Sequence, residues 1–238
     1  FGFQNRFRHW ERVMLIRTLS GKCRGLLRHR TIAALAAVAF MVAGTSVYSY
    51  DATPDVLRVE EDWELILDEP SNSLAAPQLM TVMSPKEDLD DLYGMVTWNY
   101  REIPSFYSGG LQLQSWSDDL FLYSKNFREG EFSTTGETIS WTQSLKVNNN
   151  ILTLRIKDGQ SDTWGSFGGT QMQLSELILV NNLNNYSPET SVENSAVTYG
   201  AYRVVKLRIK EVRYYDADNN LISTDNTSRV VHERPSNN

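Results

Sequence analysis

Three carboxylates offer the clearest chemistry in this sequence, because Glu60, Asp62 and Glu64 alternate along one short segment. Alternate residues of a β-strand point to the same side of a sheet, so these side chains are expected on one strand face. Two carboxylates about 5 Å apart suit glycoside hydrolysis with retention of configuration. The opposite face of the segment is largely apolar, which is typical of a strand whose acidic face lies in solvent. The sequence favours this solvated outer face over a catalytic site.

A second polar cluster, Asp216, Asp218 and Asn220, spaces oxygen ligands as the start of a calcium-binding loop does. Such a loop needs glycine at its sixth position and glutamate at its twelfth, where this chain has Leu221 and Thr227. A polar turn between two strands explains the cluster more simply. The chain has one cysteine and three histidines, which are too few for a Cys/His metal cluster, and we expect no cofactor.

Five tryptophans lie in residues 51–238 and are candidates for the core or for a ligand site. Trp63, Trp98 and Trp141 sit within alternating segments, which predicts that they fill the core. Trp116 and Trp164 border loops rich in Ser, Asp and Gly. An exposed indole can stack on the apolar face of a sugar, so these two residues are the candidate ligand-binding positions.

The elements that must position these side chains are short alternating strands with turn residues between them. The run 147–151 contains three consecutive asparagines and predicts a hairpin turn. A weak helical period at 171–180 marks the best candidate for a helix. The fold class predicted is all-β, an antiparallel β-sandwich or jelly roll, with strands at 59–67, 78–83, 92–101, 110–116, 138–147, 151–157 and 203–215.

Charge divides the chain into three parts. Residues 1–30 hold eight Lys or Arg against one acid, and residues 31–50 carry no charge. The remaining residues hold 15 basic and 28 acidic side chains. The net charge of −6 is therefore the sum of +7 in residues 1–30, the basic head, and −13 in the rest of the chain, the acidic body. An acidic body repels phosphates, and we expect no nucleic-acid partner.

The apolar run at 31–50 predicts a membrane-crossing helix behind a basic head, residues 1–30, that stays in the cytoplasm. A cleaved signal peptide and an uncleaved signal anchor both fit this run, and the charge asymmetry disfavours a buried core helix. A basic head of the conventional kind, which precedes an apolar run, would begin at Met14. Residues 1–13 are therefore expected to be upstream read-through or a remnant. Residues 51–238 then form an exported domain, anchored in the inner membrane or secreted after cleavage.

Residues 140–159 and 205–216 resemble a strand-turn-strand unit and a late strand of concanavalin-A-like lectin and glucanase sandwiches. The spacing of Glu60, Asp62 and Glu64 is similar to that by which laminarinase-type glucanases place nucleophile, helper and acid/base. In those enzymes, however, the motif lies mid-chain beside a cleft lined by aromatic residues. Residues 59–65, 109–116 and 161–169 are similar to an uncharacterised family of exported, mostly planctomycetal bacterial proteins. That second resemblance implies no known activity and no functional residue.

These observations favour a non-enzymatic envelope protein with an exported structural or glycan-binding β-sandwich. Its expected partners are the membrane, through residues 31–50 if they are not cleaved, and polysaccharide or envelope proteins. The rival is a glycan hydrolase that uses Glu60, Asp62 and Glu64. An accessory subunit of a secretion or pilus system is a third possibility, which rests on topology alone.

Overall fold

The computed structural model describes residues 53–68, 77–100, 110–128, 130 and 136–235. The predicted basic head and apolar run, residues 1–50, lie outside these residues, as does Arg101 at the end of one predicted strand. Across the part of the chain that is described, no helix is both long enough and apolar enough to span a membrane.

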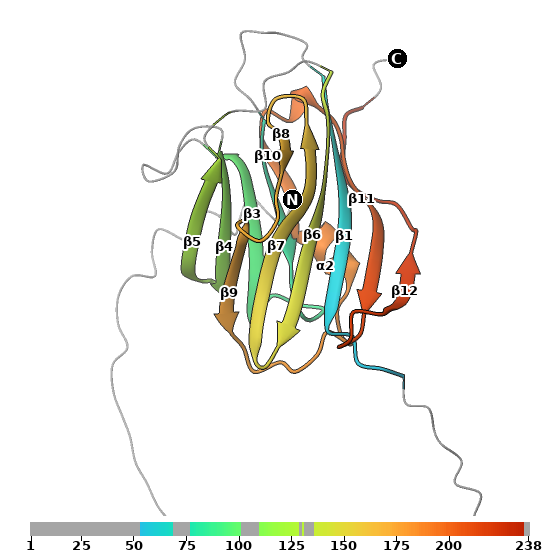
Figure 1. The fold of residues 1–238 in the computed structure, drawn as a ribbon. Coiled ribbons are helices and arrows are strands. Elements are labelled where there is room, and N and C mark those ends of the chain that lie inside the picture. The colour runs from blue at the N-terminus through green and yellow to red at the C-terminus, as the bar shows by residue number, and fades with distance from the viewer. Residues whose placement is uncertain (1–52, 69–76, 101–109, 129, 131–135, 236–238) are drawn as a thin grey trace, which may run out of the picture. The chain divides into compact units, whose positions relative to one another are not determined.

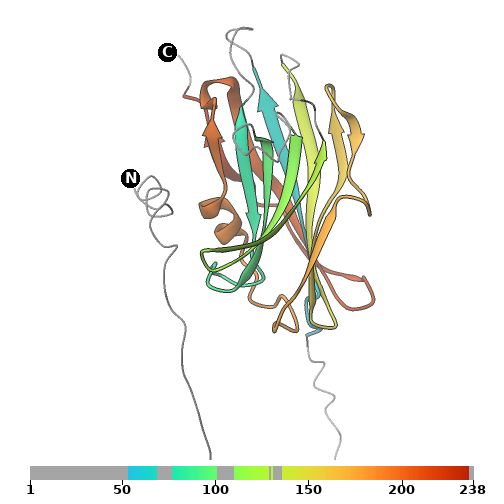
Figure 2. The same cartoon turned by 90° about the vertical axis from the view of Figure 1, so that its left-hand side faces the viewer.

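The described residues form a mainly antiparallel β-structure of two sheets (Figures 1 and 2). Sheet A has the order β12-β11-β1-β6-β7-β8, with β13 also paired to β11 and β9 to β7. Its strands are β1 (Arg58–Leu67), β6 (Thr138–Asn148), β7 (Ile151–Ser161), β8 (Gly165–Phe167), β9 (Gln173–Leu177), β11 (Val204–Tyr215), β12 (Leu221–Asp225) and β13 (Arg229–Glu233). Sheet B has the order β10-β2-β3-β4-β5, from β10 (Ala196–Tyr199), β2 (Gln78–Met83), β3 (Leu92–Tyr100), β4 (Gly110–Ser117) and β5 (Leu120–Arg128). The helix α2 (Pro188–Asn194) precedes β10, and a 3₁₀ turn, Ala201–Arg203, precedes β11.

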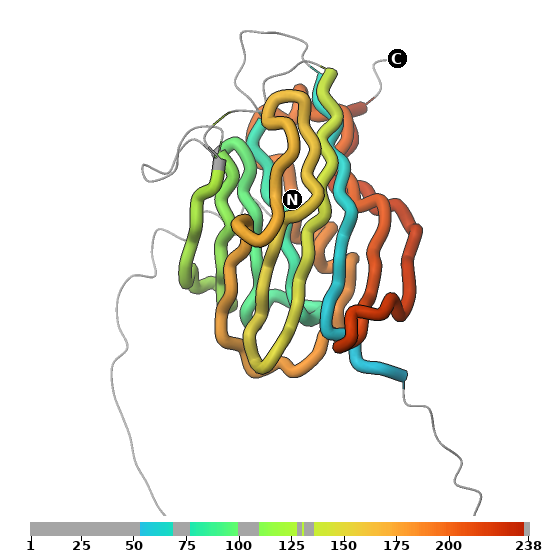
Figure 3. The backbone as a smooth tube through the Cα atoms, viewed as in Figure 1, coloured from blue at the N-terminus to red at the C-terminus, as the bar shows by residue number. Residues whose placement is uncertain are grey.

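Strand β1 confirms the predicted alternation. Five side chains of this strand are at most 1% exposed and face the interior: Val59, Glu61, Trp63, Leu65 and Leu67. The intervening side chains face outward. Both neighbours of β1 come from much later in the sequence, since it lies between β6 and β11 (Figure 3). The outward face of β1 is therefore flanked by side chains that the local sequence does not reveal.

The core lies between the two sheets and is built around three tryptophans. Trp63, Trp98 and Trp141 are at most 2% exposed, which confirms their predicted place in the core. Trp141 of sheet A stacks on Trp63 with ring centroids 5.9 Å apart and meets Trp98 of sheet B at 4.4 Å. The sheets approach so closely that a Cβ on Gly94 would lie 2.7 Å from Leu154 Cδ2.

The hairpin between β6 and β7 is confirmed, with Asn149 and Asn150 at φ 48° and 60°. Positive φ at both central residues matches the twist of the flanking strands, and asparagine tolerates that conformation.

The predicted helix at 171–180 is wrong, because residues Gln173–Leu177 form β9 against β7. The ladder from Ile151↔Leu177 to Arg155↔Gln173 overrides a weak local helical preference.

The sequence interpretation also missed α2, whose signal is short but present. Ser187 is its N-cap, Pro188 opens the helix, and Glu189 lies in the first turn.

Candidate functional site

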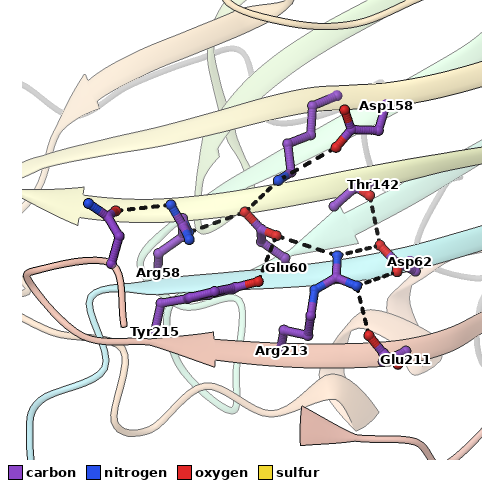
Figure 4. Close-up of polar contacts among 10 residues, drawn as sticks. Arg58, Glu60, Asp62, Thr142, Asp158, Glu211, Arg213 and Tyr215 are labelled. Atoms are coloured by element: carbon purple, nitrogen blue, oxygen red, sulfur yellow. Dashed lines mark hydrogen bonds and ion pairs between the residues drawn. The ribbon is translucent and has the colours of Figure 1, made fainter. Parts of the chain in front are cut away.

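Glu60 lies on the outer face of β1 and is held by cations from three strands. Its Oε1 lies 2.8 Å from Lys157 Nζ of β7 and 3.2 Å from Arg58 Nε, and its Oε2 lies 3.4 Å from Arg213 Nη2 of β11. The Tyr215 hydroxyl also donates to Oε2 at 3.3 Å (Figure 4). The Glu60 side chain is 3% exposed. The expectation of a solvated outer face is wrong for this residue, because its partners on β1, β7 and β11 cover it.

The other two carboxylates of the alternating motif also face cations. Asp62 makes a bidentate pair with Arg213, at 2.6 Å and 2.8 Å, and accepts a hydrogen bond from Thr142 Oγ1 at 2.7 Å (Figure 4). Glu64 Oε1 lies 2.6 Å from Arg208 Nη2 and 2.8 Å from its Nε. Retaining hydrolysis needs one carboxylate that is free to attack the sugar and a second carboxyl group that is free to deliver a proton, whereas these side chains are held in ion pairs. The three side chains share one face as expected, and their partners suit an ion-pair ladder that ties β1 to its neighbours.

Glu61 is a buried carboxyl group on the opposite, inward face of β1. Its Oε1 accepts a hydrogen bond from the Tyr186 hydroxyl, and its Oε2 accepts one from Trp63 Nε1 at 3.0 Å. The Tyr186 hydroxyl lies 3.1 Å from Ser191 Oγ in α2, so the cluster connects β1 to the helix. The sequence interpretation gave Glu61 no role. Its signal was a lone carboxylate at an inward position of an alternating strand.

Burial raises the pKa of Glu61 from 4.5 to about 7. Desolvation outweighs the hydrogen bonds from Tyr186, Ser191 and Trp63 and the attraction of Arg229, all of which favour the charged form. Burial beside Glu61 also raises the pKa of Tyr186 well above its usual value, so the tyrosine stays protonated and continues to donate. Glu61 therefore changes its charge near neutral pH inside the protein.

Trp116, one of the two candidate sugar-stacking residues, lies on the outer face of sheet B near the end of β4. Its ring is half-buried and meets Phe121 of β5 edge-on, with centroids 5.2 Å apart. Its Nε1 donates to Gln114 Oε1 at 2.8 Å, and Gln114 in turn donates to Gln112 on the same face. The ring is accessible in part, while the amides beside it are buried and bonded to one another.

Trp164, the other candidate, closes one end of the core. Its ring stacks on Trp98 at 6.2 Å and meets Phe167 edge-on at 5.4 Å. Its Nε1 donates to the Gly130 carbonyl oxygen at 2.9 Å. The loop that carries it is tied down by the buried Glu137, which accepts a hydrogen bond from the Thr163 amide at 3.0 Å. These contacts favour packing over ligand stacking for Trp164.

The Asp216 cluster is the polar turn that the sequence predicts between β11 and β12. Asp216 accepts hydrogen bonds from the amide of Asp218 at 2.9 Å and from the amide and side chain of Asn220 at 2.8 Å and 2.9 Å. These bonds, led by the Asn220 side chain, lower the pKa of Asp216. Within the described ranges, no group of three or more His, Cys, Asp and Glu side chains has the arrangement of a metal site.

An open groove of about 310 Å³ lies on the outer face of sheet A, and we call it the outer-face groove. Ten residues line it: Arg58 and Glu60 of β1, Ser144, Lys146 and Asn148 of β6, Ile151, Thr153, Arg155 and Lys157 of β7, and Gln173 of β9. All but Ile151 carry a polar or charged side chain, and neither Trp116 nor Trp164 is among them. The groove brings together strands that are not consecutive in the chain.

Sequence reasoning identified Glu60 in this groove but missed the residues around it. The alternation of polar and apolar residues could have indicated them. Thr153, Arg155 and Lys157 occupy the polar positions of a strand whose other positions are apolar. Ser144, Lys146 and Asn148 repeat this period on the preceding strand. Cross-strand pairing sets Ser144 opposite Arg155 and Lys146 opposite Thr153.

No protein-family model matches this chain, and no curated protein shows significant sequence similarity to it.

Proposed function

We propose that this chain is an exported, non-enzymatic envelope protein whose β-sandwich, of the jelly-roll kind, binds a glycan in the outer-face groove. The observation that carries the proposal is the groove's lining of hydroxyl, amide and cationic side chains. A sugar presents many hydroxyl groups that both donate and accept hydrogen bonds, and side chains of these types can pair with them. Rigid strands hold the lining side chains, which limits the entropy lost on binding.

Binding without cleavage is favoured by the state of the carboxylates. Glu60 is the one carboxylate in the lining, and it is already engaged by Arg58 and Lys157. Asp62 and Glu64 are paired to Arg213 and Arg208. A hydrolase of the laminarinase type would need one of these groups to attack the sugar and another to deliver a proton. Their ion pairs support a structural role instead.

Export is proposed from the basic head and the uncharged run at 31–50. The body would then lie outside the cytoplasmic membrane, anchored by that run or released by cleavage. A reporter active only in the cytoplasm, fused after Asn238, should give no signal. A strong cytoplasmic signal would contradict export.

The function is tested with the full-length chain, kept in solution by a neutral detergent, against a panel of polysaccharides scored for both binding and cleavage. We expect binding without release of reducing ends. Arg155→Ala should weaken binding by about 10- to 100-fold, since a hydrogen bond to a charged group contributes about 1.5–3 kcal/mol. Trp116→Ala is the matched comparison on sheet B and should leave the affinity unchanged.

Two results would contradict the proposal. Cleavage that is lost in Glu64→Gln, with the fold intact, would establish the hydrolase. Loss of affinity in Trp116→Ala but not in Arg155→Ala would move the ligand from the groove to the outer face of sheet B.

A further inference from the structure

The charge of the outer-face groove is opposite to that of the domain around it. The lining holds four cationic side chains and one carboxylate, whereas residues 31–238 together carry −13. A concave patch of one sign attracts ligands of the other sign, even on a protein whose net charge is unfavourable. The groove is therefore the place on this acidic domain where an anion would be drawn.

Two of the four cations are committed to the carboxylate in the groove. Lys157 Nζ lies 2.8 Å from Glu60 Oε1, and Arg58 Nε lies 3.2 Å from the same oxygen. Arg58 also lies over the Tyr215 ring at 3.9 Å and donates to Asn219 at 3.0 Å. These cations neutralise Glu60 and hold it in place, so they have little charge left for a ligand.

The other two cations have no acidic partner in the described part of the chain. Lys146 makes no hydrogen bond or ion pair there. Arg155 donates from Nε to Gln173 Oε1 at 3.0 Å, a neutral partner that orients the guanidinium without neutralising it. Both side chains are half-buried. Partial burial reduces the screening of a charge by water and strengthens its attraction to an incoming anion.

Strand pairing places these two cations side by side. Lys146 lies opposite Thr153, and Arg155 lies opposite Ser144, so Lys146 and Arg155 are diagonal neighbours on adjacent strands. Diagonal neighbours are roughly 7–8 Å apart. The other two residues of this group of four, Ser144 and Thr153, carry hydroxyl groups. Hydroxyl groups suit the neutral hydroxyls of a sugar. The guanidinium can bind a planar acid group with two parallel hydrogen bonds, while the ammonium acts as a point charge.

We propose that the outer-face groove binds an acidic polysaccharide, one that carries carboxylate or sulfate groups, through Lys146 and Arg155. This inference rests on the proposed glycan-binding function and specifies its ligand class. The absence of any aromatic side chain from the lining supports it, because neutral glycans are commonly held by stacking on aromatic rings. The hydroxyl and amide groups beside the cations favour a sugar over other polyanions.

The test compares polysaccharides that share a backbone and differ in charge, using the full-length chain in neutral detergent. The first pair is polygalacturonate and its methyl ester, and the second is dextran sulfate and dextran. Binding of at least one acidic member and of neither neutral member is expected, with an affinity that falls as salt is raised. The pair that binds distinguishes a carboxylate from a sulfate ligand.

A double variant, Lys146→Gln with Arg155→Gln, should weaken acidic binding by about tenfold or more. The matched control, Lys86→Gln with Lys125→Gln, removes the same charge at two sites outside the groove, the first half-buried and the second exposed, and should keep the affinity. Urea unfolding midpoints of both double variants should match that of the parent chain, so a loss of affinity reports on binding and not on folding.

The other outcomes each overturn a defined part of the argument. Equal binding of charged and neutral members would refute the acidic ligand while leaving the glycan-binding function standing. No binding to any member of an extended panel would refute both. Equal losses in the two double variants, or equal binding of a single-stranded oligonucleotide, would show general attraction of polyanions and refute a specific site.

Discussion

Glu61 is expected to make the stability of the protein fall as the pH rises from about 4.5 to 8. The pKa of this carboxyl group is 4.5 when it is free in water, and burial in the fold raises it to about 7. The folded chain therefore holds a proton in this range that the unfolded chain releases. Each pKa unit corresponds to about 1.36 kcal/mol, so the shift amounts to about 3 kcal/mol of unfolding free energy. This stability is fully present below pH 4.5 and is lost as the pH rises through 7.

Glu61→Gln tests this directly, because glutamine has nearly the same shape and cannot ionise. One of its two polar atoms is an NH₂ group, which cannot accept from Trp63 or Tyr186, so a constant cost of about 1–3 kcal/mol is expected at every pH. The informative quantity is how the difference in unfolding free energy between variant and parent changes with pH. The stability of Glu61→Gln relative to the parent chain should rise by about 3 kcal/mol between pH 4.5 and pH 8.

The assay is urea unfolding followed by tryptophan fluorescence at several pH values in that range. Taking the difference between variant and parent cancels the groups that titrate equally in both chains. Three titratable groups near Glu61 keep their charge state throughout this range, because the pKa of each is raised: Arg229, Tyr186 and Tyr214. Thr227 and Arg229 lower the pKa of Asp225 to about 2, so it titrates below the window.

Glu64→Gln on the outer face is the control, and its stability curve should run parallel to that of the parent chain. The reasoning is refuted if Glu61→Gln shows the same pH dependence as the parent. It is also refuted if Glu64→Gln removes that dependence equally well.

Two further predictions concern stability alone. Glu60→Gln should cost about 1.5–3 kcal/mol, because the side chain is 3% exposed and faces three cations, whereas Glu64→Gln, 14% exposed, should cost less than about 1 kcal/mol. Equal urea midpoints for the two variants would mean that the ladder around Glu60 contributes nothing. Trp141→Ala should cost about 3–5 kcal/mol as a core aromatic, and Trp116→Ala clearly less because its ring is half-exposed. A larger loss in Trp116→Ala would contradict this assignment of core and surface.

The sequence determined the features that depend on local periodicity. The alternation of β1 placed five side chains inward, and the asparagine run fixed the β6–β7 hairpin, because side-chain direction and turn geometry are set within a few residues. The same logic placed three tryptophans in the core. The sequence also carried the signals of α2 and of the inward carboxylate Glu61, although both signals were too short to stand out.

Tertiary structure decided the features that depend on which strands are neighbours. Residues 173–177 became a strand because β7 offered a pairing edge, which outweighed a weak helical preference. Glu60 is shielded because β7 and β11 bring Lys157 and Arg213 to its side, although both lie about a hundred residues or more further along the chain. The groove exists because the order β1-β6-β7-β9 sets four outward faces next to one another. Strand order follows from packing the whole core, and no local pattern specifies it.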